Sequence, residues 1–448
     1  MDVRVRIRIL YGFFCVLGLA TAFGCGGLAP SEEPARPNII LVSIDTLRAD
    51  HIRGYGYARE TTPVLDDLMS RGASFMNAVS AAPWTLPAHM SLFTSLYPHA
   101  HGVTAELLAL DEGVMTLPLL LKRAGYTTGG FATMPHLSPR HGFGRGFDFY
   151  ECREMKASEA LPRAYTWMKQ NSSKSFFLFI HLFDVHSPYE PLPHYRAMFE
   201  PSYEGGLDGT EETLYKIRTG EISLSPEDLR HLVALYDAEI RQLDNALGMF
   251  FESLEQAGVA ENTVFIVTSD HGEEFLEHGG ILHGRTLYDE VVRIPLIMKG
   301  PGIAAGKRVE QQVQLIDIAP TILALCGENP PASLQGRSLL PLLGQNVPEW
   351  PEHAFVEADW RNEKHDIKRA VRTNGYKLYY DRLTGEEELY DLEKDPAEQV
   401  NILGEQPDVA EALRQRLREW MSSPRGTPQT ITLTETEKDQ LRALGYMK

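Results

Sequence analysis

The sequence predicts an α/β fold in which a large, mostly parallel central β-sheet lies between helices, followed by a smaller antiparallel sheet with a covering helix. Three observations predict it. Continuous apolar runs of strand length recur along the chain, at 37–45, 176–183, 263–268 and 294–298. Segments whose apolar residues have helical spacing separate these runs, as in parallel sheets whose strands are joined by helices. After about residue 350, short strand-like segments precede a single amphipathic helix.

From residue 37 to residue 224, strands alternate with short helices. The run at 37–45 is apolar throughout and follows a proline, so it is expected to be a buried parallel strand. A glycine ends the short helix predicted at 117–125. The polar stretch at 188–224 shows no periodic pattern of apolar residues. The predicted elements are, in order, a strand at 37–45, helices at 62–71 and 117–125, strands at 127–132 and 176–183, and an irregular lid at 188–224.

The second half begins with the strongest helix signal of the chain. Ser225, Pro226 and Asp228 form a capping pattern, and apolar residues then recur at helical spacing to about Ala257, with Gly258 beyond the end. That apolar stripe is expected to be core. The elements that follow are strands at 263–268 and 294–298, short strands at 354–358, 369–372 and 376–380, and a helix at 407–421.

The N-terminus has the pattern of an export signal. Three arginines precede an apolar run at 9–23 that is short for a membrane span. Cys25 follows at a position that resembles a bacterial lipoprotein cleavage site, where the cysteine would carry lipid and tether the protein to a membrane. Ordinary signal cleavage and an uncleaved anchor are the alternatives. In each case we expect an exported protein of the periplasm or outer cell envelope. The predicted domains are a signal peptide at 1–24, of lipoprotein type or not, a linker at 25–36, an α/β catalytic domain at 37–345 and a small α+β subdomain at 346–448.

The charge balance argues against one class of partner. The 448 residues carry a formal net charge of −18 and show no basic stripe, so nucleic acid is not expected to bind. An anionic substrate would have to be drawn in by local cations or by a metal ion.

Hard metal ligands stand where predicted strands end. Asp45 ends the run at 37–45, and Asp270 and His271 follow the run at 263–268. The carboxyl ends of parallel strands meet at one edge of a sheet, where ligands bind. Each residue alone is as typical of a cap or a turn, but their convergence favours a site. With an oxygen of Thr85 they would complete four ligands for a divalent cation such as zinc, manganese or calcium, and we predict one such site rather than two.

Thr85 stands just before a predicted helix start. Pro83 and Pro87 fix the entry of the chain, and the apolar turn begins at residues 91–93. Unpaired backbone N–H groups at a helix start favour an anion, and a bound metal ion lowers the pKa of a hydroxyl. Thr85 is therefore a candidate nucleophile, although a threonine alone at such a position is most often a cap.

Together these segments resemble the sulfatase branch of the alkaline phosphatase superfamily, over nearly the whole mature chain. The opening strand resembles the family's metal strand, and the stretch that begins at Thr85 matches the sulfatase signature in frame. Later blocks match as well. The resemblance is carried by residues 37–50, 85–89, 91–98, 317–321, 336–343 and 388–401. It implies the family's fold and an activity on sulfate or phosphate esters of a small molecule, a glycan or a lipid.

The departures from the family pattern bear on the chemistry. Sulfatases place at position 85 a cysteine or serine that is oxidised to formylglycine, and threonine cannot become that aldehyde. Threonine with Asp270 and His271 resembles the phosphate-transferring members instead. A formylglycine hydrate can expel sulfate by breaking a C–O bond and reforming the aldehyde. A threonine ester cannot do this, so water or an alcohol must attack the phosphorus or sulfur. We therefore expect phosphodiester or phosphoryl chemistry, with sulfate ester hydrolysis and a catalytically silent envelope binding protein as the alternatives.

The resemblance also implies residues around the reacting ester. His186 matches the histidine that contacts the ester or protonates the leaving group, so we predict Thr85 and His186 as catalytic. His283 alternatively joins Asp184 or His186 in a second metal site. The predicted substrate-binding residues are His89 at the signature arginine position, His136 near a family block whose lysine is missing, and His283 and Arg285 where a lysine is expected.

Overall fold

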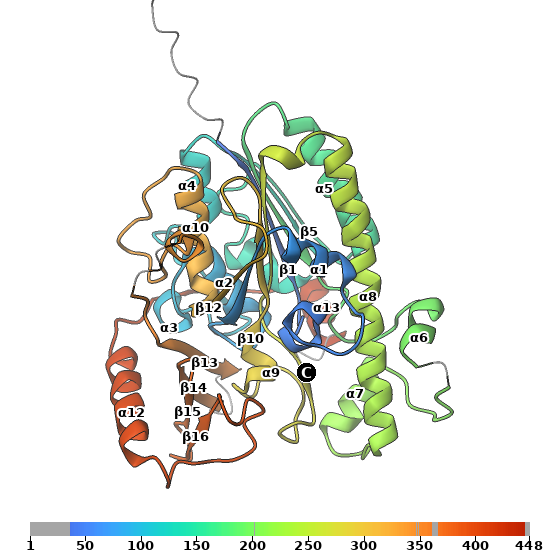
Figure 1. The fold of residues 1–448 in the computed structure, drawn as a ribbon, viewed down its shortest axis with the longest axis vertical. Helices are drawn as coiled ribbons and strands as arrows, with labels where there is room; N and C mark the ends of the chain where they lie inside the picture. The colour runs from blue at the N-terminus through green and yellow to red at the C-terminus, as the bar shows by residue number, and fades with distance from the viewer. Residues whose placement is uncertain (1–35, 201, 346, 348, 361–365, 444–448) are drawn as a thin grey trace, which may run out of the picture. The chain divides into compact units, whose positions relative to one another are not determined.

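The centre of the fold is a β-sheet that has nine strands in the computed structural model, which describes residues 36–200, 202–345, 347, 349–360 and 366–443. The predicted signal peptide, the Cys25 tether and the linker up to residue 35 lie outside the described residues. Figure 1 shows the sheet edge-on between helices. Its strands are β1 (Asn38–Ile44), β2 (Ala73–Val79), β4 (Thr127–Ala132), β5 (Phe149–Cys152), β6 (Phe176–Leu182), β7 (Thr263–Ser269), β10 (Arg293–Ile294), β11 (Leu296–Lys299) and β12 (Lys307–Gln314).

Most neighbouring strands of the central sheet are parallel, as predicted. The strand order is β10-β2-β11-β7-β1-β6-β4-β5, and β12 pairs with β2. β1 runs parallel to both β6 and β7, whereas β11 runs antiparallel to β7 and β2. Ile44 pairs with Leu182 on one side and with Ser269 on the other. This register brings the carboxyl ends of three strands to one edge of the sheet.

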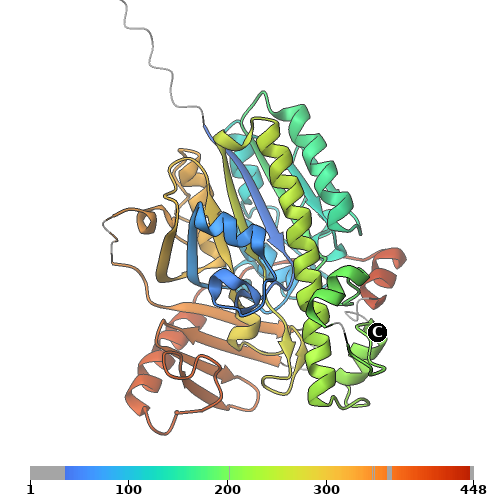
Figure 2. The same ribbon diagram turned by 45° about the vertical axis from the view of Figure 1, so that its right-hand side comes forward.

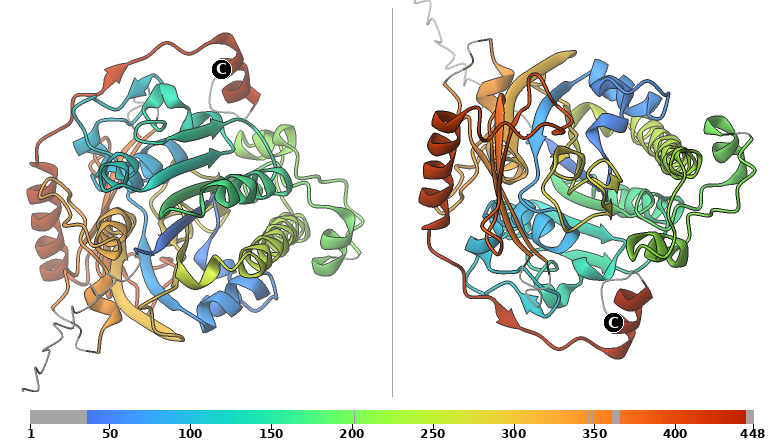
Figure 3. Two further views of the ribbon diagram at one scale, coloured as in Figure 1. Left: turned by 90° about the horizontal axis from the view of Figure 1, so that it is seen from above. Right: turned by 90° about the horizontal axis from the view of Figure 1, so that it is seen from below.

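Helices cover both faces of this sheet because successive side chains of the strands point to opposite sides. Ile39 and Leu41 of β1 pack into one apolar cluster, and Ile40 and Val42 pack into another. The first cluster is covered by α2 (Thr85–Thr94), α4 (Leu117–Arg123) and α10 (Ile318–Leu325), and the second by α1 (Pro63–Ser70), α5 (Ala157–Asn171) and α8 (Pro226–Gln256). Figures 2 and 3 show α5 and α8 side by side on their face.

The longest helix begins and ends where the sequence predicts. Ser225 caps α8 in a reciprocal capping box with Asp228, and Gly258 follows its end with a φ of +69°. The stretch 188–224, predicted as irregular, contains two short helices, α6 (Pro193–Phe199) and α7 (Glu211–Arg218). Helices of two turns give too few apolar repeats to be read from a sequence. None of the described helices is long and apolar enough to cross a membrane.

A second, antiparallel sheet lies at the lower left of Figure 1 with one helix packed on it. Val371, Leu378 and Leu389 of the sheet contact Leu413 and Leu417 of the helix. Both the sheet and its helix were predicted, although the last strand was not. The elements are β13 (Ala354–Trp360), β14 (Asp366–Arg372), β15 (Tyr376–Asp381), β16 (Glu387–Asp391) and α12 (Pro407–Met421). The predicted domain boundary near residue 345 stays a prediction.

Candidate metal centre and active site

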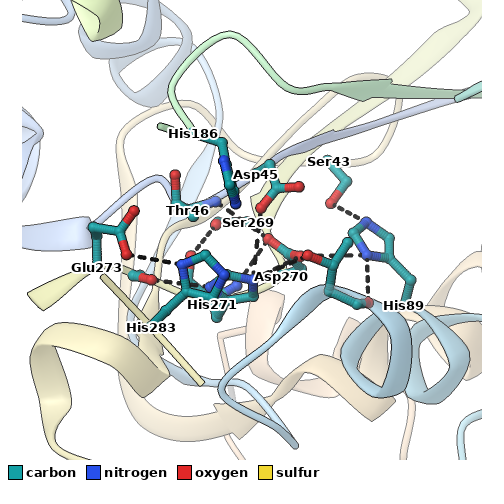
Figure 4. A network of polar contacts seen from close by, with 12 residues as sticks. Ser43, Asp45, Thr46, His89, His186, Ser269, Asp270, His271, Glu273 and His283 are labelled. Carbon is teal, nitrogen blue, oxygen red and sulfur yellow. Dashed lines mark hydrogen bonds and ion pairs between the residues drawn. The ribbon is translucent and has the colours of Figure 1, made fainter. Parts of the chain in front are cut away.

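Asp45, Asp270 and His271 meet at the carboxyl edge of the central sheet. Their ligand atoms all lie within 4.8 Å of one another, and the three side chains point toward a common centre in Figure 4. Nε2 of His271 is 3.6 Å from Oδ1 of Asp45 and 3.3 Å from Oδ2 of Asp270. All three residues are fully buried. The parallel pairing of β1 with β7 explains the cluster, because each strand ends directly before its ligand.

Three of the four carboxylate oxygens of this cluster lack a hydrogen-bond partner among the described residues. Both carboxylate oxygens of Asp45 and Oδ2 of Asp270 are buried without a hydrogen bond. Nδ1 of His271 lies 2.9 Å from the Gly272 carbonyl oxygen, which can only accept. The proton is therefore on Nδ1, and Nε2 directs a lone pair at the two carboxylates. Such an arrangement is costly when buried unless a cation fills its centre, so the donor set fits a divalent metal ion.

Burial also sets the protonation of the two carboxyl groups. It raises the pKa of Asp45 to about 7, an effect that nearby His271 opposes. It raises the pKa of Asp270 to about 7 as well, and repulsion from Asp45 adds to the effect. A cation that binds here has to displace protons at neutral pH, so its affinity should increase as the pH rises.

Thr85 is the first residue of α2 and lies beside the three ligands. Its hydroxyl Oγ1 is 3.4 Å from Nε2 of His271, and the residue is fully buried. The predicted helix start is confirmed within one residue, with Trp84 in the cap position. The hydroxyl therefore lies where a fourth oxygen ligand or a nucleophile would be placed.

His89 lies one turn after Thr85 in α2, and its ring contacts Asp270. Its Nδ1 is 3.0 Å from the Thr85 carbonyl oxygen and 3.4 Å from Oδ2 of Asp270, and its Nε2 is 2.9 Å from the Ser43 hydroxyl. Burial lowers the pKa of His89 to about 3, so the imidazole is neutral. It therefore carries no charge like that of the signature arginine. Its role in substrate binding stays a prediction.

His186 and His283 lie on the other side of His271. The ring centre of His283 is 4.4 Å from that of His271 and 5.0 Å from that of His186. Nδ1 of His283 is 2.8 Å from Oε1 of Glu273, whose Oε2 accepts a 3.0 Å hydrogen bond from Tyr189. Burial lowers the pKa of His186 to about 3 and that of His283 well below its usual value. The arrangement is a histidine oriented by a buried carboxylate.

Two family models match the chain. The model described as Sulfatase matches residues 37–328, and the model described as N-sulphoglucosamine sulphohydrolase, C-terminal, matches residues 277–423. The chain belongs to the sulfatase family. It is thus an enzyme of the sulfatase superfamily, whose members depend on metal ions, in agreement with the donor set formed by Asp45, Asp270 and His271.

Relatives within this family are similar over most of their length. Arylsulfatase K of Canis lupus familiaris is 26% identical over 465 residues, which cover 90% of this chain and 86% of the relative. The Δ4,5-hexuronate-2-O-sulfatase of Bacteroides thetaiotaomicron is 25% identical over 438 residues, 86% of this chain and 87% of the relative. The solved phosphonate monoester hydrolase of Agrobacterium radiobacter is 23% identical, covers 90% of this chain and 99% of its own, and superposes with a TM-score of 0.71. A protein solved with its substrate D-glucosamine-2-N,6-O-disulfate gives 0.74 at 22% identity, over 86% of this chain and 97% of its own. The structural likenesses establish the sulfatase fold.

Three residues considered in the sequence make other contacts than with the three candidate ligands. Arg285 is exposed, and no contact among the described residues joins it to the three ligands. His136 is buried against the Trp84 ring, at a centroid distance of 5.7 Å, next to the start of α2. Asp184 accepts hydrogen bonds at 3.0 and 2.8 Å from the backbone N–H of Ala157 at the start of α5. Asp184 is thus engaged by a helix rather than by His283. The substrate roles of Arg285 and His136 stay predictions.

Two buried residues near the ligands were not predicted. Glu273 follows His271 by two positions. The sequence feature that could have identified it is an acidic residue in the same loop as a predicted ligand. His181 lies in β6 with Nε2 3.2 Å from Oδ2 of Asp45. The sequence feature that could have identified His181 is a polar residue within an otherwise apolar strand.

Proposed function

We propose that this chain is a metal-dependent hydrolase of sulfate esters that uses Thr85 as its nucleophile. The observation that carries the proposal is the Thr85 hydroxyl, 3.4 Å from a buried imidazole within a cluster of two carboxylates. The sequence favoured phosphoryl chemistry. The curated relatives reported above are named sulfatases, which supports sulfate ester hydrolysis, the alternative. An imidazole with carboxylate ligands favours zinc or manganese over calcium.

The proposed reaction proceeds through an ester of Thr85. When bound, a divalent cation lowers the pKa of an adjacent hydroxyl and offsets charge on the ester oxygens. Oγ1 of Thr85 gives its proton to a neutral imidazole, of His283 or His186, and attacks sulfur in line with the ester oxygen. The Oγ1–S bond forms as the bond from sulfur to that oxygen breaks. The imidazole returns the proton, and an alcohol leaves.

The second half of the reaction restores the threonine. Water loses a proton to the same imidazole and attacks the sulfur, the Oγ1–S bond breaks, and sulfate leaves. Oγ1 of Thr85 regains its proton, and the site is ready for another ester. Glu273 holds Nδ1–H of His283 and would stabilise the imidazolium that forms at each stage.

We propose a sulfated sugar, free or within a glycan, as the substrate class. The named substrate of one structural relative is a glucosamine disulfate, and one curated relative is an N-acetylglucosamine-6-O-sulfatase of Bacteroides thetaiotaomicron. Export to the cell envelope, with or without lipid on Cys25, remains part of this proposal and rests on the N-terminal sequence alone.

A substrate panel tests the reaction class. We expect the zinc- or manganese-loaded protein to hydrolyse 4-nitrophenyl sulfate and glucosamine 6-sulfate with higher kcat/KM than 4-nitrophenyl phosphate, bis-4-nitrophenyl phosphate or a phenylphosphonate ester. A preference for phosphorus would support phosphate or phosphonate ester chemistry. That candidate is favoured by an unmodified threonine and by the phosphonate monoester hydrolase likeness in fold. No turnover of any ester by the metal-loaded protein would support a binding protein.

His283 should matter most for esters with poor leaving groups. We expect His283→Asn to lower kcat about 10²-fold or more on glucosamine 6-sulfate but tenfold or less on 4-nitrophenyl sulfate, because a nitrophenolate leaves without a proton. Glu273→Gln should show the same dependence with smaller losses. The control is His194→Asn, an exposed histidine in α6 that should change neither rate. Equal losses on both esters would remove His283 from proton transfer.

A further inference from the structure

A buried histidine that the proposed mechanism does not use lies against Asp45. His181 is the next-to-last residue of β6, pairs with Ser43 of β1, and is fully buried. Its Nε2 is 3.2 Å from Oδ2 of Asp45, and its Nδ1 is 3.0 Å from the Thr133 hydroxyl. It is not among the three residues whose ligand atoms cluster within 4.8 Å, so it contacts one candidate ligand without belonging to the cluster.

The charge on Asp45 selects one tautomer of this imidazole. The Thr133 hydroxyl can donate either to Nδ1 of His181, at 3.0 Å, or to the His181 carbonyl oxygen, at 3.2 Å. If it donated to the carbonyl, Nδ1 would carry the proton and Nε2 would turn a lone pair toward a carboxylate, which is repulsive. If it donates to Nδ1, Nε2 carries the proton and attracts Oδ2 of Asp45 at 3.2 Å, a close polar contact that is not aligned as a hydrogen bond.

His89 makes the matching contact on the second carboxylate. Its Nδ1 must carry a proton, since the Thr85 carbonyl oxygen at 3.0 Å can only accept, and that N–H also lies 3.4 Å from Oδ2 of Asp270. The rings of His89 and His181 are 5.0 Å apart. Each candidate ligand carboxylate is therefore contacted by one neutral imidazole, Asp45 by His181 and Asp270 by His89. A neutral donor orients a carboxylate without the repulsion that a lysine or arginine would exert on a bound cation.

We propose that His181 is a positioning residue for Asp45: its protonated Nε2 lies 3.2 Å from Oδ2, attracts it and so restricts the orientation of the carboxylate, while Thr133 fixes the tautomer of His181. The inference rests on the proposed function, because it requires a cation in the ligand cluster. Residues that orient a ligand commonly change metal affinity by 10- to 100-fold when they are removed.

Zinc affinity, measured by competition with a chromophoric chelator on the full-length protein, tests the proposal apart from turnover. We expect His181→Phe to weaken zinc binding about 10- to 100-fold and Thr133→Val to weaken it several-fold, whereas Thr133→Ser retains the hydroxyl and the wild-type affinity. The matched control is His101→Phe, a buried histidine that contacts Ser91 at 3.1 Å, which should leave zinc affinity unchanged. The zinc concentration for half-maximal activity should shift by the same factors, with KM for the ester unchanged.

The outcomes separate the two proposals. Zinc bound by His181→Phe and by Thr133→Val within twofold of the wild-type affinity overturns the positioning role and leaves the metal centre intact. A folded wild-type protein that binds neither zinc nor manganese overturns both. If His181→Phe fails to fold, the pair Thr133→Val and Thr133→Ser decides, because only the hydroxyl distinguishes them in hydrogen bonding.

Discussion

Replacing Thr85 by alanine should abolish turnover, with kcat about 10⁴-fold lower or less than can be measured, while the protein stays folded. The substitution removes the only protein atom proposed to form a bond to sulfur. Nearby water could attack directly, but without the positioning that the start of α2 gives the hydroxyl. Zinc affinity should fall far less than turnover, because Asp45, Asp270 and His271 remain.

Two companion variants sharpen this test. Thr85→Ser keeps a hydroxyl and should retain measurable activity, and Thr94→Ala removes another buried hydroxyl of α2, which donates to the Met90 carbonyl away from the ligands. Thr94→Ala should lower stability and leave kcat close to wild type. Mass spectrometry during turnover of a slow ester should find a sulfuryl group on the peptide that contains Thr85. Near-normal activity in Thr85→Ala would show that water, not threonine, attacks.

The elements predicted from the sequence are those with long, uniform apolar patterns. β1 and β7 are buried along their whole length, and α8 is buried along one apolar stripe, so their apolar residues follow a pattern that the sequence shows directly. β12 was missed because most of its residues are polar and a register shift between Val309 and Gln312 interrupts the alternation of buried and exposed side chains. α5 was missed because Pro162 interrupts its helical pattern, although the structure keeps the helix continuous.

The same reasoning separates the predicted site residues from those that were missed. Asp45 and Asp270 could be predicted because parallel strands end at one edge, so an acid directly after each strand must lie there. His181 could not, since its function depends on which neighbour β6 pairs with and on the register of that pair. Glu273 acquires its role only through His283, ten residues away across a loop. Strand ends are local properties of a sequence, whereas these pairings are tertiary.

Asp45→Asn should have opposite effects on function and on stability. The variant loses one negative ligand, so zinc affinity should fall by at least 10²-fold and turnover should fall with it. The metal-free protein, in contrast, should become more stable at pH 8. Burial raises the pKa of Asp45 from 3.8 to about 7, which means that the folded state holds this proton more tightly than the unfolded state does. The stability of the metal-free wild type therefore declines as the pH rises from about 4 to 7.

An asparagine at position 45 removes this pH dependence at one carboxyl group. One pKa unit corresponds to about 1.4 kcal/mol, so the stabilisation of the metal-free variant at pH 8 should be on the order of 4 kcal/mol, and near zero at pH 4. The neutral amide would lie beside Nε2 of His271 and Nε2 of His181, whose distances to the Asp45 oxygens are 3.6 and 3.2 Å. Urea unfolding of both proteins at pH 4, 6 and 8 with a chelator measures this difference.

Zinc should narrow this difference in stability at pH 8. Zinc stabilises the wild type more than the variant, by about 2.7 kcal/mol for a 100-fold difference in affinity and about 4.1 kcal/mol for a 1,000-fold difference, so a loss of affinity beyond about 10³-fold reverses the order. Asp317→Asn is the control: Asp317 is buried, its pKa is also raised to about 7 by burial, and it accepts from the backbone N–H of Gln314 and Arg337 away from the ligands. That variant should bind zinc normally. If the metal-free wild type were more stable than metal-free Asp45→Asn at pH 8, burial of the ionised Asp45 carboxylate would not destabilise the fold. This carboxylate would then not require a bound cation, and the proposed chemistry depends on that requirement.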